Sequence, residues 1–237
     1  MSHSHRPRNP IYCALDQSDR EAAIVLARRL RGAVGGLKLG LEFFAANGPE
    51  GVRAVAAENL PLFLDLKLHD IPNTVAGAVR AICRLPVAMT TLHASGGEAM
   101  LRAARRSRDE SGSELRLLAV TLLTSLEQRD LQRMGIAGTV SDHVLRLAET
   151  ALAAGLDGLV CSPRELTAIR ARFGEEPLLV VPGIRTSPTG DDQKRTASAE
   201  GALAAGADLL VIGRPITRAS DPAAAARAIL QSPTEAA

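Results

Sequence analysis

Aromatic residues are scarce in this chain, at 2% of the total, with no Trp and a single Tyr. Proteins that bind single-stranded nucleic acid stack the bases on aromatic side chains, so the composition argues against that class. The formal net charge is only +2, too small to attract a polyanion or a membrane surface. We therefore expect neither a nucleic-acid partner nor a membrane partner.

Cysteines and long apolar runs are also few. Cys13, Cys83 and Cys161 are widely spaced, odd in number, and each lies in an apolar context. This is typical of reduced, buried thiols in a cytoplasmic protein and does not indicate a metal site. The longest apolar stretches are far too short to span a membrane. The polar N-terminus also lacks the apolar core segment of a signal peptide, so we expect a cytoplasmic location.

The chain does have a regular alternation of short apolar runs with amphipathic segments rich in Ala and Arg. Hydrophobic residues make up 46% of its 237 residues, enough for the core of one large domain. The apolar runs predict eight strands, over residues 11–15, 36–39, 62–66, 88–92, 115–122, 158–161, 178–181 and 209–212. Helices are predicted between them, with capping signals at Ser18-Asp19-Arg20-Glu21, Ser162-Pro163-Arg164-Glu165 and Asp221-Pro222.

Eight βα repeats without a linker predict an α/β fold, a single (β/α)8 TIM barrel over residues 11–231. Residues 1–10 are expected to form a flexible N-terminal arm and residues 232–237 a flexible tail. The alternative is an open, doubly wound sheet. It would have fewer strands and a Gly-rich turn after the first, where this chain has Leu15-Asp16-Gln17-Ser18.

Polar side chains follow most of the predicted strands. TIM barrels place their chemistry at the C-terminal ends of the strands. The residues at these ends are Asp16, Lys38, Asp65 with Lys67, His93, Thr124, Arg185 and Gly213-Arg214. Only the sixth strand, which ends at Cys161-Ser162, has nothing strongly polar there. The pattern predicts a functional site at this end of the barrel.

The most unusual segment is Asp65-Leu66-Lys67-Leu68-His69-Asp70-Ile71-Pro72-Asn73-Thr74. Side chains two residues apart on a strand share a face, so Asp65 and Lys67 should point the same way. Asp70 follows just past the strand end. Charged side chains at the end of a buried strand lower the stability of the fold unless they form ion pairs, so they are otherwise retained only where they take part in function. The segment therefore indicates either an ordinary ion pair that caps the strand or a catalytic site.

The last two strands end in groups suited to binding phosphate. Arg185 follows the seventh strand, and the polar segment 186–195 after it has the length of a closing lid. Gly213 after the eighth strand would let the backbone approach an anion, and Arg214 would supply two hydrogen bonds. Phosphate sites in TIM barrels commonly use these two loops. The alternative is a simple Gly-Arg turn with a solvated Arg.

A set of motifs in fixed order, from Asp16 to Arg214, resembles one family. The motifs are Ala14-Leu15-Asp16, Leu37-Lys38-Leu39-Gly40, the Asp65-to-Thr74 run, His93-Ala94-Ser95-Gly96-Gly97, Leu123-Thr124-Ser125, Pro182-Gly183-Ile184-Arg185, Gln193 and Gly213-Arg214. Together they resemble the orotidine 5′-phosphate decarboxylase family in its bacterial form. The Asp-x-Lys-x-x-Asp spacing is shared with related sugar-phosphate decarboxylases, but the extension Ile71-Pro72-Asn73-Thr74 is more specific.

The resemblance implies a homodimer with shared active sites and a role for each matching residue. It implies a proton donor, Lys67, within a network of alternating charges made of Lys38, Asp65, Lys67 and Asp70. Asp70 and Thr74 would enter from the partner subunit, with Thr74 on the ribose side. Ribose hydroxyls would be bound by Asp16 and Lys38, the pyrimidine edge by Thr124, and the phosphate by Arg185, Gln193, Gly213 and Arg214. His93 receives no role.

The implied reaction converts orotidine 5′-phosphate to UMP and CO2, and leaves an anion at C6 that the ring cannot delocalise. Most decarboxylases use a cofactor as an electron sink. This chain has no evident pyridoxal lysine and no acidic or His cluster with ligand spacing, so we expect no cofactor and no metal. The ammonium of Lys67 would instead stabilise the anion and protonate it.

Two other readings stay open at this point. One is a Mg²⁺-dependent sugar-phosphate decarboxylase of the same superfamily, which would stabilise an enediolate. The other is a non-catalytic barrel that binds a nucleotide phosphate.

Overall fold

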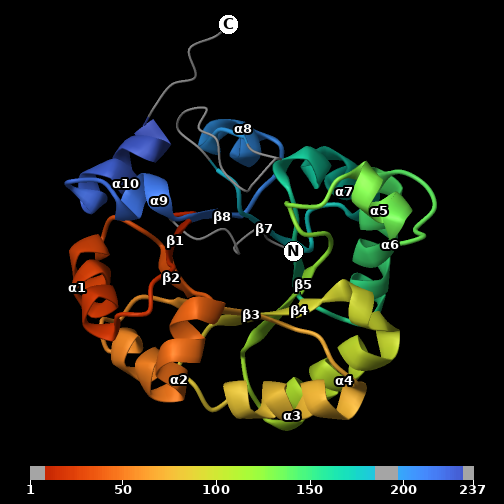
Figure 1. Cartoon of the computed structure of the whole chain (residues 1–237), viewed down its shortest axis with the longest axis horizontal. Coiled ribbons are helices and arrows are strands. Elements are labelled where there is room, and N and C mark those ends of the chain that lie inside the picture. Colours follow the sequence, from red (N-terminus) through yellow and green to blue (C-terminus); the bar gives the residue numbers. More distant parts are fainter. Residues whose placement is uncertain (1–8, 185–196, 232–237) are drawn as a thin grey trace, which may run out of the picture.

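A computed structural model describes residues 9–184 and 197–231. Eight parallel strands close into a barrel in sequence order, and helices surround it (Figure 1). The strands are β1 (Ile11–Leu15), β2 (Gly36–Leu39), β3 (Leu62–Leu68), β4 (Met89–His93), β5 (Arg116–Val120), β6 (Gly158–Val160), β7 (Leu178–Val181) and β8 (Leu209–Ile212). The predicted TIM barrel is confirmed, and the open sheet is excluded because β1 pairs with β8.

The helices fall between the strands, as expected. They are α1 (Arg20–Leu30), α2 (Leu41–Ala56), α3 (Pro72–Ile82), α4 (Gly97–Glu110), α5 (Gln128–Arg133), α6 (Val140–Ala153), α7 (Leu166–Phe173), α8 (Ala199–Ala204), α9 (Arg214–Thr217) and α10 (Pro222–Gln231), with short 3-10 turns η1 (Ala94–Gly96) and η2 (Pro163–Glu165). In the two described ranges, no helix has the length and apolarity needed to cross a membrane.

The strand boundaries differ from prediction where pairing, rather than hydrophobicity, decides them. Strands β1, β2, β7 and β8 match to the residue. Strand β3 continues to Leu68, past the charged residues, because it resumes pairing with β4 there. Strand β5 ends at Val120 although the apolar run continues to Leu122, because its partner β6 ends at Val160.

Helix starts follow the capping signals with one exception. Ser162 accepts a hydrogen bond from the Arg164 amide, and Glu165 accepts one from the Ser162 amide, as the predicted capping box requires. Asp221 caps α10 through two amides. The prediction of a box starting at Ser18 is wrong, since Asp19 is the cap and accepts from the Ala22 amide. Asp is at least as good a cap as Ser, so the helix starts one residue later.

The sequence places Asn9 and Pro10 in the N-terminal arm, and in the structure both are bonded to the barrel. The Asn9 amide donates to the Ala33 carbonyl at 2.9 Å. The Pro10 carbonyl accepts from the Leu210 amide of β8 at 2.9 Å. The rest of the predicted arm, residues 1–8, and the predicted tail lie outside the described residues.

Alternate strand residues face the barrel axis and fill its floor. The floor consists of Tyr12, Phe63, Met89, Leu118, Leu178, Val180 and Leu209. Gly36 makes room for the only Tyr, because a Cβ there would lie 2.3 Å from Tyr12 Cε1. Since side chains alternate along a strand, two residues beyond Phe63 the same inward face carries Asp65. The inward face of β3 therefore carries an apolar side chain in the floor of the barrel and a charged side chain at its C-terminal mouth.

The base of the barrel contains a structural repeat. Residues 151–160 (ALAAGLDGLV) and 202–211 (ALAAGADLLV) are similar in sequence and lead into β6 and β8. In both, a Gly with positive φ, Gly155 at 84° or Gly206 at 103°, follows the helix. An Asp comes two residues later in each copy, at Asp157 and Asp208.

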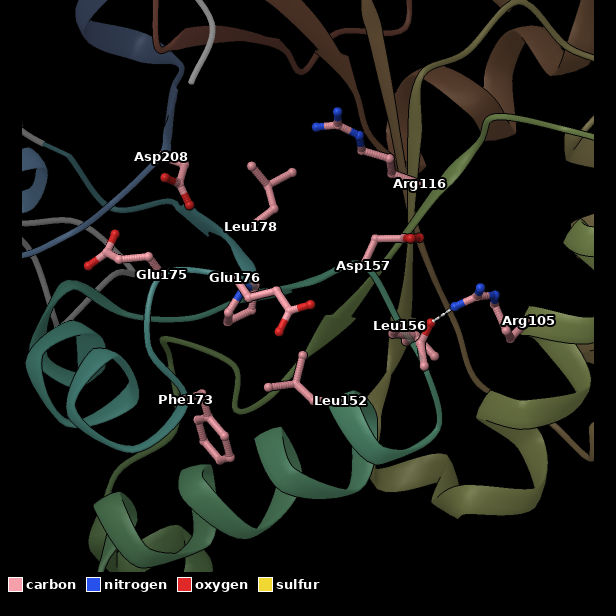
Figure 2. Close-up of a pocket in the computed structure, with 12 residues that line it drawn as sticks. Arg105, Arg116, Leu152, Leu156, Asp157, Phe173, Glu175, Glu176, Leu178 and Asp208 are labelled. Atoms are coloured by element: carbon pink, nitrogen blue, oxygen red, sulfur yellow. Dashed lines mark hydrogen bonds between the residues drawn. The ribbon is translucent and has the colours of Figure 1, made fainter. Parts of the chain in front are cut away.

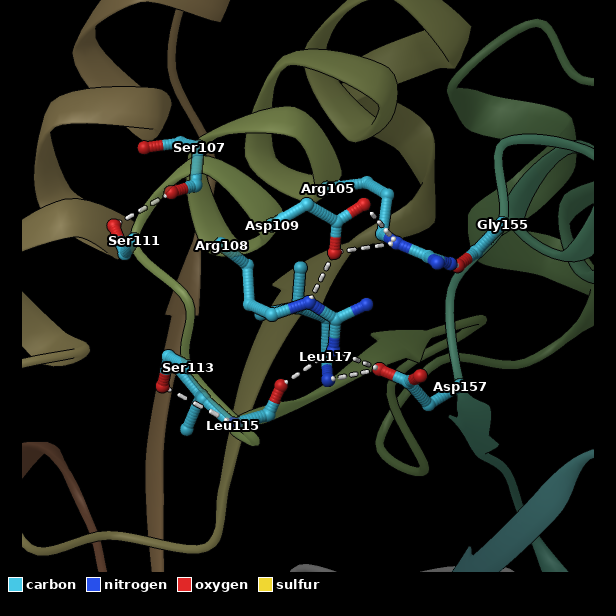
Figure 3. A network of polar contacts seen from close by, with 10 residues as sticks. All are labelled: Arg105, Ser107, Arg108, Asp109, Ser111, Ser113, Leu115, Leu117, Gly155 and Asp157. Atoms are coloured by element: carbon cyan, nitrogen blue, oxygen red, sulfur yellow. Dashed lines mark hydrogen bonds and ion pairs between the residues drawn. The ribbon is translucent and has the colours of Figure 1, made fainter.

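Each of these Asp residues ties a neighbouring strand to a helix. Asp157 accepts from the Leu117 amide at 2.7 Å and from Arg108 at 3.2 Å, within the network of Figure 3. In the second copy, Asp208 accepts from the Leu179 amide and from Arg170, both at 2.7 Å. Arg170 also donates to the carbonyls of Gly174 and Gly206, just beyond the ends of α7 and α8, and to that of Pro177, just before β7. The repeat therefore links strands and helices at the base of the barrel.

We expect Asp208→Ala to lower the free energy of unfolding by about 3 kcal/mol or more, because the buried Arg170 charge then keeps only the more distant and exposed Glu175 carboxylate, at 3.9 Å. Both side chains of this pair are only 9% exposed. Urea denaturation measures the effect. The matched control is Glu149→Ala, which breaks an ion pair of similar length between exposed side chains and should cost less than about 1 kcal/mol. Equal losses in the two variants would contradict the assignment.

Candidate active site

Four side chains of alternating charge form a row across β1, β2 and β3 at the C-terminal mouth of the barrel. Lys38 Nζ lies 2.7 Å from Asp16 Oδ1 and 3.9 Å from Asp65 Oδ2. Lys67 Nζ lies 2.8 Å from the same Asp65 oxygen. Asp65 therefore bridges two ammonium groups, and the structure brings these four predicted site residues together.

Strand β3 is irregular where it carries this pair. Its register against β4 shifts between Leu64 and Leu68. Lys67 adopts the left-handed conformation, with φ of 52°, which is uncommon for a residue other than Gly. The Lys67 amide donates to Thr91 Oγ1 at 2.9 Å, and the same hydroxyl donates to Asp65 Oδ1 at 2.8 Å.

Sequence reasoning missed Thr91. The available signal was the pair Thr90-Thr91 inside an otherwise apolar strand, where two hydroxyls must find partners. Both side chains are fully buried, and Thr90 donates to the Leu64 carbonyl at 2.8 Å.

Burial and charge act in opposite directions on Asp65. Burial alone would raise the pKa of its carboxyl, but Lys67, Lys38 and the hydrogen bonds from Lys67 and Thr91 together bring the pKa below its usual value. Asp65 thus remains a carboxylate at neutral pH. The Lys67 side chain is 28% exposed, against 10% for Lys38, so the Lys67 ammonium is the more accessible of the two.

His93 ends β4 beside this row, and its ring centroid lies 5.3 Å from that of His69. Burial lowers the pKa of His93, and the nearby His69 and Lys67 lower it further, against a smaller opposing effect of Asp65. His93 is therefore neutral at physiological pH.

Asp70 and Thr74 lie apart from the row. Asp70 accepts a hydrogen bond from the Ile71 amide and forms no salt bridge with any residue that the structure describes. Thr74 lies in the first turn of α3, and both side chains are exposed. Ile71 between them is also exposed, by 66%. A shallow hollow of about 520 Å³ is lined by His69, Asp70, Ile71, Pro72, Ser95 and Gly96.

Only two of the predicted phosphate-binding residues, Gly213 and Arg214, lie within the described part of the chain. A Cβ on Gly213 would lie 4.0 Å from Asp16 Oδ2, so the end of β8 reaches the row of charges. Arg214 follows as the first residue of α9 and is exposed. Arg185 and Gln193 lie outside the described residues, as does the predicted lid. Thr124 lies beyond the end of β5 and is half-buried.

A cavity of about 600 Å³ lies at the opposite end of the barrel, at the start of β5 and β7 (Figure 2). Its charged and aromatic lining comprises Arg105, Arg116, Asp157, Phe173, Glu175, Glu176 and Asp208. Two of these belong to the repeat that holds the base together. Because this end of a TIM barrel serves stability, we place the site at the mouth. Across the described residues, no three His, Cys, Asp or Glu side chains gather to hold a metal ion.

The chain is similar to known proteins over almost its whole length. Residues 9–229 match the model of the orotidine 5′-phosphate decarboxylase / HUMPS family. The chain belongs to this family. A family member from Paramagnetospirillum magneticum, named orotidine 5′-phosphate decarboxylase, is 52% identical over 224 residues, or 92% of this chain and 95% of that one. One of the same name from Rhodospirillum rubrum is 52% identical over 236 residues, or 97% and 96%.

A solved structure of the family has the same barrel. The crystal structure of orotidine 5′-phosphate decarboxylase from Lactobacillus acidophilus matches with a TM-score of 0.82 at 34% sequence identity. The match covers 94% of this chain and 98% of that one. The fold of the family is therefore shared along almost the whole length.

We expect Lys67→Met to raise the pKa of the Asp65 carboxyl, because burial remains while the nearest counter-charge is removed. Carbon-13 NMR titration of the Asp side chains measures it, with Arg172→Met, far from the mouth, as control. In the unmodified protein the lowered pKa favours folding above the ordinary value of 3.8. That contribution is lost as the pH falls through the folded-state pKa. An unchanged Asp65 pKa in Lys67→Met would show that the pair does not interact.

Proposed function

We infer that the protein decarboxylates orotidine 5′-phosphate to UMP and CO2, the last step of pyrimidine nucleotide synthesis. The membership of the family and the relatives of about half identity that carry this name support the inference. The observation that carries the mechanism is the accessible ammonium of Lys67, held 2.8 Å from the largely buried Asp65 carboxylate.

The chemistry requires an anion to be stabilised at one carbon. When the bond from C6 to the carboxylate breaks, the electron pair stays on C6 in an orbital outside the ring π system, and CO2 leaves. We propose that Lys67 stabilises this pair by its charge and then transfers its Nζ proton to C6, which gives UMP. The amine recovers a proton from solvent.

Asp65 would lie near the carboxylate of the substrate. At about 4 Å and an effective dielectric constant of about 20, such repulsion amounts to roughly 4 kcal/mol. Two ammonium groups contact Asp65 and reduce this repulsion further. Enzymes lower barriers by up to about 23 kcal/mol, so stabilisation of the forming anion must contribute more than repulsion in the ground state.

The remaining predicted residues belong to the binding of the nucleotide. We propose that Asp16 and Lys38 bind ribose hydroxyls, that Thr124 contacts the pyrimidine edge, and that the phosphate is bound by Arg185, Gln193, Gly213 and Arg214. The closeness of Gly213 to Asp16 supports a nucleotide that extends from the end of β8 towards the charged row. Binding energy from the remote phosphate can then assist the reaction at C6.

We also propose a homodimer in which Asp70 and Thr74 complete the site of the partner subunit. The exposed Ile71, the hollow beside it and the absence of an ion pair to Asp70 among the described residues support a surface that a second copy covers. A cytoplasmic location is part of the proposal, and Cys13, Cys83 and Cys161, which form no disulfide within the described residues, suit a reducing compartment.

Lys67→Ala should lower kcat by at least about 10⁴-fold, because both the charge near C6 and the proton are lost. The fall in ultraviolet absorbance of orotidine 5′-phosphate measures turnover, and calorimetry with UMP should show largely unchanged product binding. Arg172→Ala, on the outer surface, is the control. Near-normal turnover in Lys67→Ala would remove Lys67 from the mechanism.

The same assay separates the alternatives. Turnover by the unmodified protein should survive EDTA, whereas a Mg²⁺-dependent sugar-phosphate decarboxylase would lose its activity. Binding of UMP without any conversion of orotidine 5′-phosphate would instead indicate a non-catalytic barrel.

Mixing Lys67→Ala with Asp70→Asn subunits should restore roughly a quarter of normal turnover, since half of the dimers are hybrids and each hybrid has one intact site. The mixture is refolded together and assayed. The control mixture, Lys67→Ala with Asp65→Asn, should stay inactive because both changes affect the same subunit's part of the site. No recovery in the first mixture would indicate that each subunit works alone.

A further inference from the structure

We propose that Thr91 is a positioning residue for the decarboxylation: a single hydroxyl fixes both the Asp65 carboxylate and the Lys67 backbone, and so aims the Lys67 ammonium. The proposal rests on the proposed function and adds a residue that does not touch the substrate. Thr91 is fully buried beneath the charged row, so its effect must pass through its neighbours.

The direction of both hydrogen bonds is fixed by chemistry. A backbone N–H can only donate, so Thr91 Oγ1 must accept from the Lys67 amide. The only proton of the hydroxyl is then free for Asp65 Oδ1, at 2.8 Å. Neither bond can reverse, and one side chain therefore specifies two neighbours at once.

The strand pairing shows why a side chain is needed here. The register passes from the pair Leu64 and Thr90 to the pair Leu68 and Leu92. Three residues of β3 lie between these pairs, and only Thr91 lies opposite them on β4. The regular ladder cannot hold Lys67 in this bulge, where φ is 52°, and the Thr91 hydroxyl takes the place of a ladder partner.

The contacts close into a ring. Thr91 holds Oδ1 of Asp65, which turns Oδ2 towards Lys67 Nζ at 2.8 Å. The backbone of the same lysine returns to Thr91. The positions of the Lys67 backbone and of its ammonium therefore both depend on one buried oxygen, Thr91 Oγ1. Removal of that oxygen frees the carboxylate to rotate and the bulge to relax.

The test compares two adjacent threonines. Thr91→Val removes the hydroxyl at nearly constant volume and should lower kcat about 10- to 100-fold with KM within about threefold, since a small misplacement of a catalytic group has this effect. Thr91→Ala should show the same loss of kcat, so the test does not depend on how well Val is tolerated. Thr91→Ser retains the hydroxyl and should recover kcat to within about threefold of the unmodified protein.

Thr90→Val is the matched control, because it removes an equally buried hydroxyl with a hydrogen bond of the same 2.8 Å, made to the Leu64 carbonyl. It should lower thermal stability as Thr91→Val does but leave kcat within about twofold. Equal losses of kcat at the two positions, or no recovery in Thr91→Ser, would reduce Thr91 to a structural residue.

A second readout does not depend on activity. In Thr91→Val the pKa of Asp65 should rise, because the hydrogen bond from Thr91 helps to lower it. The charged or titratable groups that face Asp65, namely Lys67 on β3, Lys38 on β2 and His93 on β4, are unchanged in this variant. If the unmodified protein did not convert orotidine 5′-phosphate while Thr91→Val still raised the pKa of Asp65, the proposed function would be overturned. An unchanged Asp65 pKa in Thr91→Val would overturn the role of Thr91.

Discussion

A largely buried carboxylate shared between two ammonium groups is the constraint on which the mouth of this barrel depends. Asp65 is only 13% exposed, and without Lys38 and Lys67 it would carry an uncompensated charge at the end of a buried strand. The pairing keeps Asp65 ionised and holds Lys67 in place. The irregular backbone of β3 and Thr91 beneath it both hold the ion pair between Asp65 and Lys67 in place.

The same strand geometry explains why the charges lie here. Inward-facing residues alternate with residues that pack against the helices, so Phe63 fills the floor and Asp65 stands above it. Polar groups can lie on the axis only where the floor ends and solvent is reached. The barrel thereby separates a dry lower part from a charged upper part along each strand.

Much of this architecture could be predicted from the sequence, because it depends on local patterns. The apolar runs locate all eight strands, and the two-residue period places Asp65 beside Lys67. The row from Asp16 to Lys67 follows from the parallel pairing of β1 with β2 and of β2 with β3, which places the C-terminal ends of these strands side by side. What could not be predicted depends on pairing between strands: the register shift of β3, the left-handed Lys67 and the part of Thr91 all require β4 to be placed against β3. The Ser18 box failed for a different reason, since two adjacent residues were both competent caps.

The repeat that leads into β6 and β8 stabilises the molecule at the end of the barrel opposite the charged row. Each copy joins a helix end, a neighbouring strand and an arginine through one aspartate. Substitutions at the base would consequently alter how long the protein survives heat, while substitutions at the mouth would alter how fast it works. Heat stability and turnover can therefore be changed separately. A variant with higher heat stability and native turnover should be sought through substitutions at the base of the barrel alone.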